Sequence, residues 1–150
     1  MSCGGKVLFL CSGNYYRSRF AEVLFNAQAE AAGLAWRADS RAVTLGESLK
    51  YIRGPISPFA VEGLTARGIV LEADVRHPMQ VVEADIAGSD RVIAMKEAEH
   101  RDPLEKLFPA LTDRIEYWHM HDIDCAEPAA GLAGIEGAIG ELIEELKARS

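Results

Sequence analysis

Cys11 and Arg17 stand six positions apart in a short stretch, residues 11–18, with the sequence CSGNYYRS. A thiolate is a strong nucleophile, and a guanidinium group presents a planar fork that matches two oxygens of a phosphate group. Gly13 lets the backbone approach a ligand closely, and Asn14 is one of the few non-glycine residues that tolerates a left-handed conformation. These residue types could together surround an anion beside a nucleophilic sulfur.

Two secondary-structure elements are expected to hold this stretch in place. Residues 6–10, which are apolar after Lys6, are typical of a buried parallel strand. Residues 18–32 carry an apolar stripe at helical spacing, with Ser18 as a favourable N-cap and Gly33 at the end of the helix. The loop thus joins the end of a strand to the N-terminus of a helix, where unpartnered backbone N–H groups bind anions and stabilise a thiolate.

The cysteine-to-arginine spacing is a weak signal by itself. Cysteine is among the residues most often buried, so the alternative interpretation of Cys11 is an inert core thiol. The preceding strand, the Gly-Asn pair, the Arg-Ser pair and the following helix together favour a catalytic sulfur. The predicted catalytic pair is Cys11 and Arg17, and the predicted substrate-binding residues are Ser12, Gly13, Asn14, Tyr15, Tyr16 and Ser18.

The loop resembles the active-site loop of the low-molecular-weight protein tyrosine phosphatases, in which Cys-x5-Arg-Ser lies near the N-terminus with Gly-Asn after the cysteine. Weaker resemblances follow in the same order over nearly the whole chain, at residues 39–41, 54–58, 76–78 and 90–95. The resemblance implies a double displacement in which Cys11 attacks phosphorus and forms a phosphocysteine. Arg17 and the loop amides would stabilise the phosphoryl oxygens, and no metal or cofactor would take part.

The resemblance also implies a general acid in a loop near the C-terminus, usually an aspartate followed by proline. Asp122 is the best match by its spacing after Trp118, although Ile123 replaces the proline. Asp124 and Glu127, the latter followed by a proline, remain as alternatives. The acid would protonate the leaving oxygen and then activate the water that hydrolyses the phosphocysteine.

Two aromatic residues distinguish this loop from those of better-known relatives. Tyr16 occupies the position of a second cysteine that forms a protective disulfide in many members, and Tyr15 stands where relatives often have a smaller residue. Their rings could form a wall for an aryl substrate, with at least one of them packed inward. In this family the region around residues 44–56 borders the active site, which makes Leu49, Lys50, Tyr51 and Arg53 candidate substrate contacts.

The rest of the chain is typical of an α/β protein. Further strands are expected at residues 36–40, 70–71, 91–95 and 114–118, and further helices at 57–68, 78–87, 96–107 (interrupted near Pro103) and 135–148, while 44–56 is expected to be a loop. Alternating strands and helices predict one domain over residues 1–150. It would contain an open parallel sheet of about four strands, helices on both faces, and the phosphate-binding loop after the first strand.

Composition excludes several classes of function. A net charge of −7 gives no support to nucleic-acid binding, and no apolar stretch has the length of a membrane span or signal peptide. Three unclustered cysteines suit a reducing cytoplasm, and no HExxH or CxxC motif predicts a metal site. The oligomeric state is not indicated by the sequence.

The sequence therefore favours a cysteine-dependent phosphatase acting on phosphotyrosine in proteins or on small aryl phosphates. A first alternative is a phosphatase for another phosphoryl group, such as phosphoarginine, because both substrates would use the same loop. A thiol-dependent arsenate reductase is less favoured, since it needs a relay of cysteines and residues 12–124 contain none. A non-catalytic phosphate-binding module is the remaining alternative.

Overall fold

A four-stranded parallel sheet forms the centre of the protein in the computed structural model, which describes residues 4–121 and 127–149. Its strand order is β2-β1-β3-β4, with β1 at Gly5–Cys11, β2 at Trp36–Ala42, β3 at Arg91–Ala94 and β4 at Ile115–Tyr117. β1 is an interior strand that pairs in parallel with β2 along its whole length. The predicted open parallel sheet and its strand positions at 36–40, 91–95 and 114–118 are confirmed.

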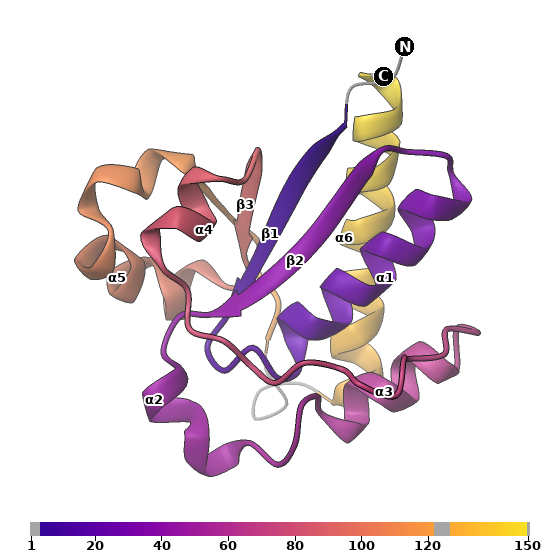
Figure 1. The fold of residues 1–150 in the computed structure, drawn as a ribbon, viewed down its shortest axis with the longest axis horizontal. Helices are drawn as coiled ribbons and strands as arrows, with labels where there is room; N and C mark the ends of the chain where they lie inside the picture. Colours follow the sequence, from indigo (N-terminus) through magenta and orange to yellow (C-terminus); the bar gives the residue numbers. More distant parts are fainter. Residues whose placement is uncertain (1–3, 122–126, 150) are drawn as a thin grey trace.

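Helices cover both faces of this sheet (Figure 1). One face carries α1 (Arg17–Ala31), α3 (Pro58–Thr65) and α6 (Pro128–Ala148), and the other carries α4 (Glu83–Ala87) and α5 (Glu97–Leu107). Successive side chains of β1 point alternately to the two faces of the sheet, so the strand contributes to both hydrophobic clusters. Val7 and Phe9 pack under α1 and α6, while Leu8 and Leu10 pack under α4 and α5.

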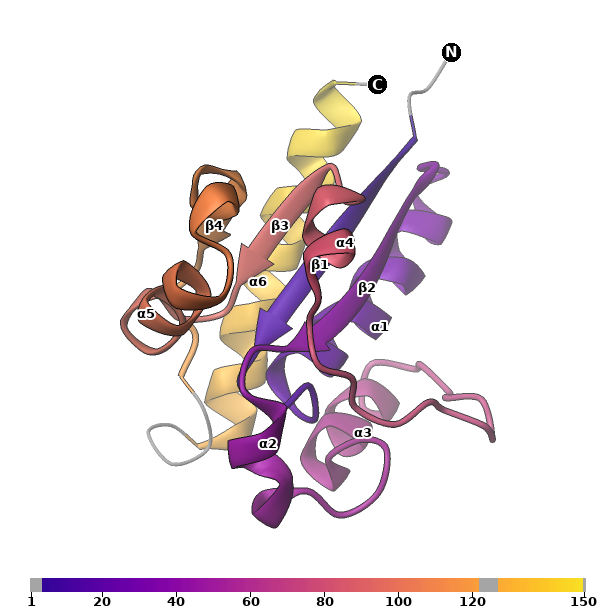
Figure 2. The same ribbon diagram turned by 60° about the vertical axis from the view of Figure 1, so that its left-hand side comes forward.

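The loop of residues 11–18, which follows β1, lies at one end of the molecule. The C-terminal ends of β1, β2 and β3 point to this end, where α2 (Leu45–Ser48) and α3 also lie, while the two termini lie at the opposite end (Figure 2). Ligands of open parallel sheets bind outside the carboxyl ends of the strands. The fold therefore places the stretch after β1 where such a site is expected.

The segment before α4 differs from the prediction of a helix over residues 78–87. Only Glu83–Ala87 is helical, because the preceding backbone extends the edge of the sheet beside Ala42. Ala42 donates its N–H to the carbonyl of Met79 at 2.7 Å, and Val81 donates to the carbonyl of Ala42 at 2.8 Å. The predicted strand at residues 70–71 is also wrong, since neither residue is in a strand.

Three other boundaries need correction. The expected loop over residues 44–56 contains α2 and a short 3-10 helix, η1 (Leu49–Tyr51). α5 continues through Pro103, which sits beyond the first turn and costs one backbone hydrogen bond. α6 begins at Pro128, seven residues before the start inferred from its apolar stripe, because proline fits the first helical position.

Other local predictions are confirmed. Ser57 is the N-cap of α3, where its hydroxyl accepts a hydrogen bond from the N–H of Phe59 at 3.2 Å. Gly33 follows α1 with a positive φ of 71°. Within the described ranges, no helix combines the length and the apolar character that crossing a membrane requires.

Candidate active site

The stretch of residues 11–18, called the phosphate loop below, joins the last residue of β1 to the first turn of α1. Asn14 adopts the left-handed conformation that its residue type permits, with φ of 52°. Neighbouring segments hold the loop through its carbonyl oxygens. Those of Cys11, Ser12 and Tyr15 accept hydrogen bonds from the N–H groups of Val43, Thr44 and Ser57 at 2.8, 3.0 and 2.9 Å.

Cys11 lies at the base of the loop with 3% of its surface exposed. Its Sγ is 3.0 Å from the Oγ of Ser18. The same Oγ accepts a hydrogen bond from the Nδ2 of Asn14 at 2.9 Å, so the hydroxyl hydrogen of Ser18 is available for the sulfur. The prediction that Ser18 is the N-cap of α1 is therefore wrong. The cap position falls at Tyr16 and has no side-chain cap, because the serine hydroxyl faces the sulfur instead.

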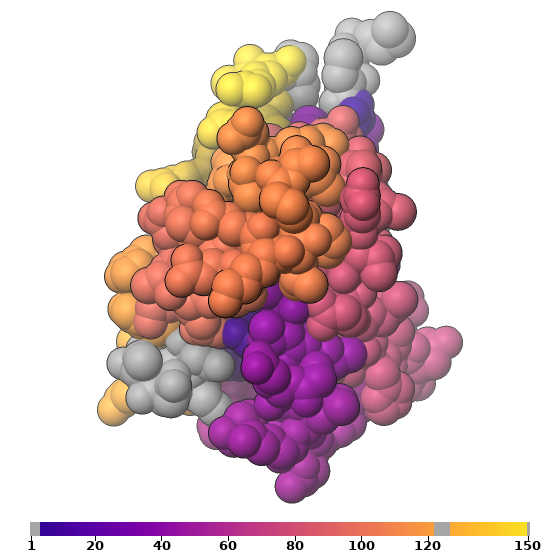
Figure 3. Space-filling view, turned by 90° about the vertical axis from the view of Figure 1, so that its left-hand side faces the viewer, coloured from indigo at the N-terminus to yellow at the C-terminus, as the bar shows by residue number. Residues whose placement is uncertain are grey.

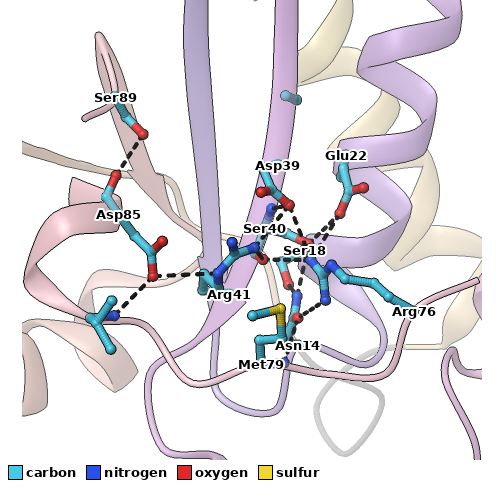
Figure 4. A network of polar contacts seen from close by, with 12 residues as sticks. Asn14, Ser18, Glu22, Asp39, Ser40, Arg41, Arg76, Met79, Asp85 and Ser89 are labelled. Atoms are coloured by element: carbon cyan, nitrogen blue, oxygen red, sulfur yellow. Dashed lines mark hydrogen bonds and ion pairs between the residues drawn. The ribbon is translucent and has the colours of Figure 1, made fainter. Parts of the chain in front are cut away.

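The side-chain amide of Asn14 is fully hydrogen-bonded (Figure 4). Nδ2 donates to Ser18 and to the Oγ of Ser40 at 2.8 Å. Oδ1 accepts from the Nη1 of Arg76 at 2.9 Å and from the N–H of Met79 at 3.1 Å. Because the N–H of Met79 and the guanidinium of Arg76 can only donate, the orientation of the amide is determined. The left-handed turn of the loop is thus fixed from its buried side.

Charged groups extend this network along the edge of β2. Glu22 accepts a hydrogen bond from the Oγ of Ser40 at 2.5 Å and lies 3.5 Å from the guanidinium of Arg76. Arg76 also contacts Asp39 at 3.1 Å and the carbonyl of Ser40 at 2.7 Å. Burial raises the pKa of Glu22, against the opposing effects of the Ser40 hydroxyl and the nearby guanidinium groups. We call Asn14, Ser18, Glu22, Asp39, Ser40 and Arg76 the rear network.

Arg17, near the end of the loop, is buried with 1% of its surface exposed. Its Nη1 and Nη2 donate to the two carboxylate oxygens of Glu99 at 3.2 and 2.7 Å, which is a bidentate ion pair. Nη1 also donates to the carbonyl of Met120 at 3.1 Å. The guanidinium is therefore held from α5 and from the segment that follows β4.

Glu99 is in turn surrounded by donors. The hydroxyl of Ser12 donates to its carboxylate, and the Nε2 of His100 lies 3.1 Å from both that hydroxyl and Glu99 Oε2. The N–H of Lys96 donates to the Nδ1 of His100 at 3.2 Å, which places the imidazole hydrogen on Nε2. Although burial acts in the opposite sense, hydrogen bonds from His100, Arg17 and Ser12 lower the pKa of Glu99 far below its usual range.

A pocket of about 500 Å³ opens above Cys11 and Arg17. In the space-filling view a small indigo area from the N-terminal part of the chain shows between the orange surface and the purple surface around α2 (Figure 3). The pocket is lined by Cys11, Ser12, Gly13, Tyr15, Tyr16, Arg17, Ser48, Tyr51, Ile52, Ser57, Pro58 and Phe59. Most of the walls are therefore aromatic or apolar.

The two loop tyrosines have different surroundings. Tyr16 packs inward with 6% of its surface exposed, and its hydroxyl donates to the carbonyl of Pro128 at 3.4 Å. Tyr15 lines the pocket, where its hydroxyl donates to the carbonyl of Arg53 at 2.8 Å. Gly13 also has a packing role, since a Cβ there would lie 3.1 Å from the Cβ of Ser48. The glycine thus lets α2 approach the loop.

The structure brings together Cys11, Arg17 and the six predicted substrate-binding residues of the loop. Asp122 and Asp124 lie outside the described residues. Glu127, the third candidate acid, is exposed at the N-cap position of α6. Of the candidate substrate contacts, Tyr51 lines the pocket, while Leu49, Lys50 and Arg53 flank its lining residues along the chain.

Sequence reasoning missed the residues that hold the loop from a distance. The sequence placed Glu99 and His100 only within the predicted helix over residues 96–107, and Met120 contributes a carbonyl oxygen that no side-chain pattern indicates. Ser40 and Arg76 lie in segments that resemble the family, which was the one signal available for them. Across residues 4–121 and 127–149, no three His, Cys, Asp or Glu side chains converge as metal ligands would.

Comparison with known proteins agrees with this geometry. The family model described as low molecular weight phosphotyrosine protein phosphatase matches residues 6–149. A protein-arginine-phosphatase from Bacillus subtilis is 30% identical over 144 residues, which cover 93% of this chain and 90% of that protein.

Solved structures show the same similarity. A low molecular weight protein tyrosine phosphatase from T. tengcongensis is 29% identical with a TM-score of 0.79, over 94% of this chain and 99% of that chain. A YwlE mutant from Bacillus subtilis is 25% identical with a TM-score of 0.77, over 95% and 99% of the two chains.

Proposed function

Because this chain belongs to the low molecular weight phosphotyrosine protein phosphatase family and is a cysteine-based phosphatase, we propose that it hydrolyses aryl phosphate monoesters, including phosphotyrosine in proteins. The pocket is the observation that carries the proposal. Its base is formed by Cys11 and the buried Arg17, and aromatic residues such as Tyr15, Tyr51 and Phe59 line the space above them. An aryl phosphate suits this arrangement, because its phosphate can bind at the base while its ring lies between the aromatic walls.

In the first step the thiolate of Cys11 attacks phosphorus, and an S–P bond forms as the bond to the aryl oxygen breaks. Ser18 supports the thiolate through its hydroxyl, which is 3.0 Å from Sγ. Arg17 and the backbone N–H groups of the loop stabilise the phosphoryl oxygens while charge redistributes. Asp122 gives its proton to the leaving aryl oxygen, which would otherwise depart as a phenolate.

In the second step water attacks the phosphocysteine. The carboxylate of Asp122 takes a proton from that water, the S–P bond breaks, and inorganic phosphate leaves with the thiolate restored. The contact between Arg17 and the carbonyl of Met120 supports this assignment, since Met120 precedes Asp122 by two positions. Asp124 and Glu127 are the alternative acids.

Phosphoarginine is the second candidate substrate, favoured by the similarity to the protein-arginine-phosphatase. A phosphorylated guanidino group carries several N–H donors that need acceptors when they enter a pocket. The described residues that line the pocket include no carboxylate. The aromatic walls favour the aryl substrate, whereas the proposed acid Asp122 is a carboxylate that could also accept a hydrogen bond from a guanidino group.

A panel of substrates tests the proposal. It contains an aryl phosphate and matched peptides that carry phosphotyrosine, phosphoserine or phosphoarginine, with arsenate plus a thiol as a separate assay. We expect turnover of the aryl phosphate and the phosphotyrosine peptide with the highest kcat/KM. A higher kcat/KM for the phosphoarginine peptide would reject the aryl proposal in favour of the second candidate. Arsenate reduction, or phosphate binding without any turnover, would reject both.

A further inference from the structure

The ion pair between Arg17 and Glu99 joins a buried side chain of the phosphate loop to a distant helix. Taking a guanidinium out of water is costly unless a paired charge and good hydrogen-bond geometry compensate for it. Arg17 is 1% exposed, and Glu99 meets it with both carboxylate oxygens. Two parallel N–H···O bonds define the plane of the guanidinium as well as its position.

Glu99 is itself held in one orientation. The hydroxyl of Ser12 and the Nε2–H of His100 approach its Oε2, and His100 is 1% exposed with its Nδ1 fixed by the N–H of Lys96. Since the hydrogen of His100 is on Nε2, the imidazole acts as a donor toward Glu99 and Ser12. The carboxylate therefore cannot rotate away from Arg17 without leaving these donors unpaired.

We propose that Glu99 is the positioning residue for Arg17, fixing the plane of its guanidinium so that it meets the oxygens of a phosphoryl group above Cys11. This inference rests on the proposed function of the Cys11 site and extends it to a residue 82 positions away from Arg17 in the chain. A guanidinium tilted out of that plane matches only one phosphoryl oxygen. The loss is greatest in the transition state, where charge on the equatorial oxygens is redistributed.

The first experiment compares Glu99→Gln with Glu97→Gln. Glu97 lies on the same helix, is exposed, and pairs with Arg101, so it is a matched control for the loss of one negative charge. We expect Glu99→Gln to lower kcat/KM for an aryl phosphate about 10²-fold, mainly through kcat, because small displacements of a catalytic group have effects of this size. The control should stay within about twofold. Circular dichroism and thermal melting verify that both variants are folded.

A double-mutant cycle separates positioning from general stabilisation. If Glu99 acts through Arg17, then Glu99→Gln added to Arg17→Lys should cost less than about threefold, because the lysine has no planar fork to position. The same loss in both backgrounds would overturn the positioning role. Glu99→Asp, which keeps the charge but shortens the side chain, should recover part of the lost kcat.

Binding of inorganic phosphate distinguishes the failure of this inference from failure of the proposed function. We expect calorimetry to give a Kd for phosphate about tenfold higher in Glu99→Gln than in the wild type. This change corresponds to the loss of one strong contact between Arg17 and a phosphate oxygen. If the wild type hydrolyses no aryl phosphate but this difference is found, the positioning role stands and the substrate proposal fails. If the wild type hydrolyses aryl phosphate while Glu99→Gln equals Glu97→Gln in both assays, the positioning role is overturned and the substrate proposal stands.

Discussion

The two sides of the phosphate loop are built differently. On the buried side, Asn14 and Ser40 have no exposed surface and belong to the rear network of hydrogen bonds and ion pairs. On the open side, the pocket mouth includes Tyr51 and Phe59, which are 72% and 44% exposed. The position of the phosphate is therefore specified by many mutually dependent contacts, whereas the leaving group meets side chains with few constraints. Substitutions in the rear network should therefore lower the turnover of every substrate, whereas substitutions at the pocket mouth should change the preference among substrates.

Removing the nucleophile is expected to have the largest effect. Cys11→Ser should lower kcat by at least about 10⁴-fold for all substrates, since the reaction loses its covalent step. Binding of inorganic phosphate should persist, because Arg17 and the hydrogen bonds that Asn14 makes to the loop and to β2 remain. Calorimetry with phosphate and a turnover assay check the two parts separately, and retained turnover would reject Cys11 as the nucleophile.

Removing the proposed acid should slow departure of the leaving group without weakening the binding of phosphate. We expect Asp122→Ala to slow a poor leaving group, such as the phenol of a tyrosine side chain, about 10²–10⁴-fold, with much less effect on an activated aryl phosphate. Phosphate binding should change little. Steady-state kinetics with leaving groups of graded pKa measure this difference. An equal loss for all leaving groups, or none, would move the role to Asp124, for which Asp124→Ala is the parallel variant.

The rear network can be tested through its central amide. Asn14→Asp keeps the size of the side chain but removes two donors, so we expect kcat/KM to fall about 10²-fold for all substrates. The free energy of unfolding should fall by about 2–4 kcal/mol, since Ser18 and Ser40 lose a buried partner. Asn26→Asp is the matched control, because the amide of Asn26 bonds the backbone of Ala38 away from the pocket. Its stability should fall while kcat/KM is retained. Equal kinetics in the two variants would contradict the role of the network.

The mouth should respond more weakly and more selectively. Tyr51→Ala is expected to raise KM for a phosphotyrosine peptide about 3–10-fold with little change in kcat, which corresponds to the loss of one aromatic contact. The Kd for inorganic phosphate should remain unchanged. Val70→Ala removes another exposed apolar side chain that does not line the pocket, and it should alter neither value. An increase in phosphate Kd for Tyr51→Ala would show that the two sides are coupled.

The smallest expected effect is a pH dependence of the free energy of unfolding that comes from the ion pair between Arg17 and Glu99. Because hydrogen bonds hold the pKa of Glu99 below its ordinary value of 4.5, its ionised form stabilises the fold above that pH, and the contribution is lost as the pH falls below it. Denaturant titrations should therefore show wild type and Glu99→Gln differing at pH 7, with the difference narrowing progressively as the pH falls below 4.5. A difference in the free energy of unfolding that is independent of pH would contradict the assigned ion pair.

The sequence was most informative where neighbouring residues determine local structure. The strand before Cys11, the left-handed Asn14 and the cap at Ser57 each follow from the residue type and its immediate neighbours. Ser18 shows the limit of such reasoning. It has the right type and position for an N-cap, yet its hydroxyl bonds the sulfur and the amide of Asn14. A competing partner close in space changed its role.

Contacts between distant segments could not be predicted. Glu99 resembles the other acidic residues of its helix in the sequence, and only the packing of α5 against one face of the sheet brings it to Arg17. Likewise, the backbone around Met79 is extended because it pairs with Ala42, although its sequence also suits a helix. Such outcomes depend on which segments meet in the fold, and local propensity contains no information about that.

The saturated amide of Asn14 has a consequence for the thermodynamics and the rate of substrate capture. Because its four hydrogen bonds are all made to groups of the protein itself, the entropy of ordering the loop is lost when the chain folds and not when an anion arrives. Association should then proceed in a single kinetic phase whose rate rises linearly with phosphate concentration, with no slower step of loop closure.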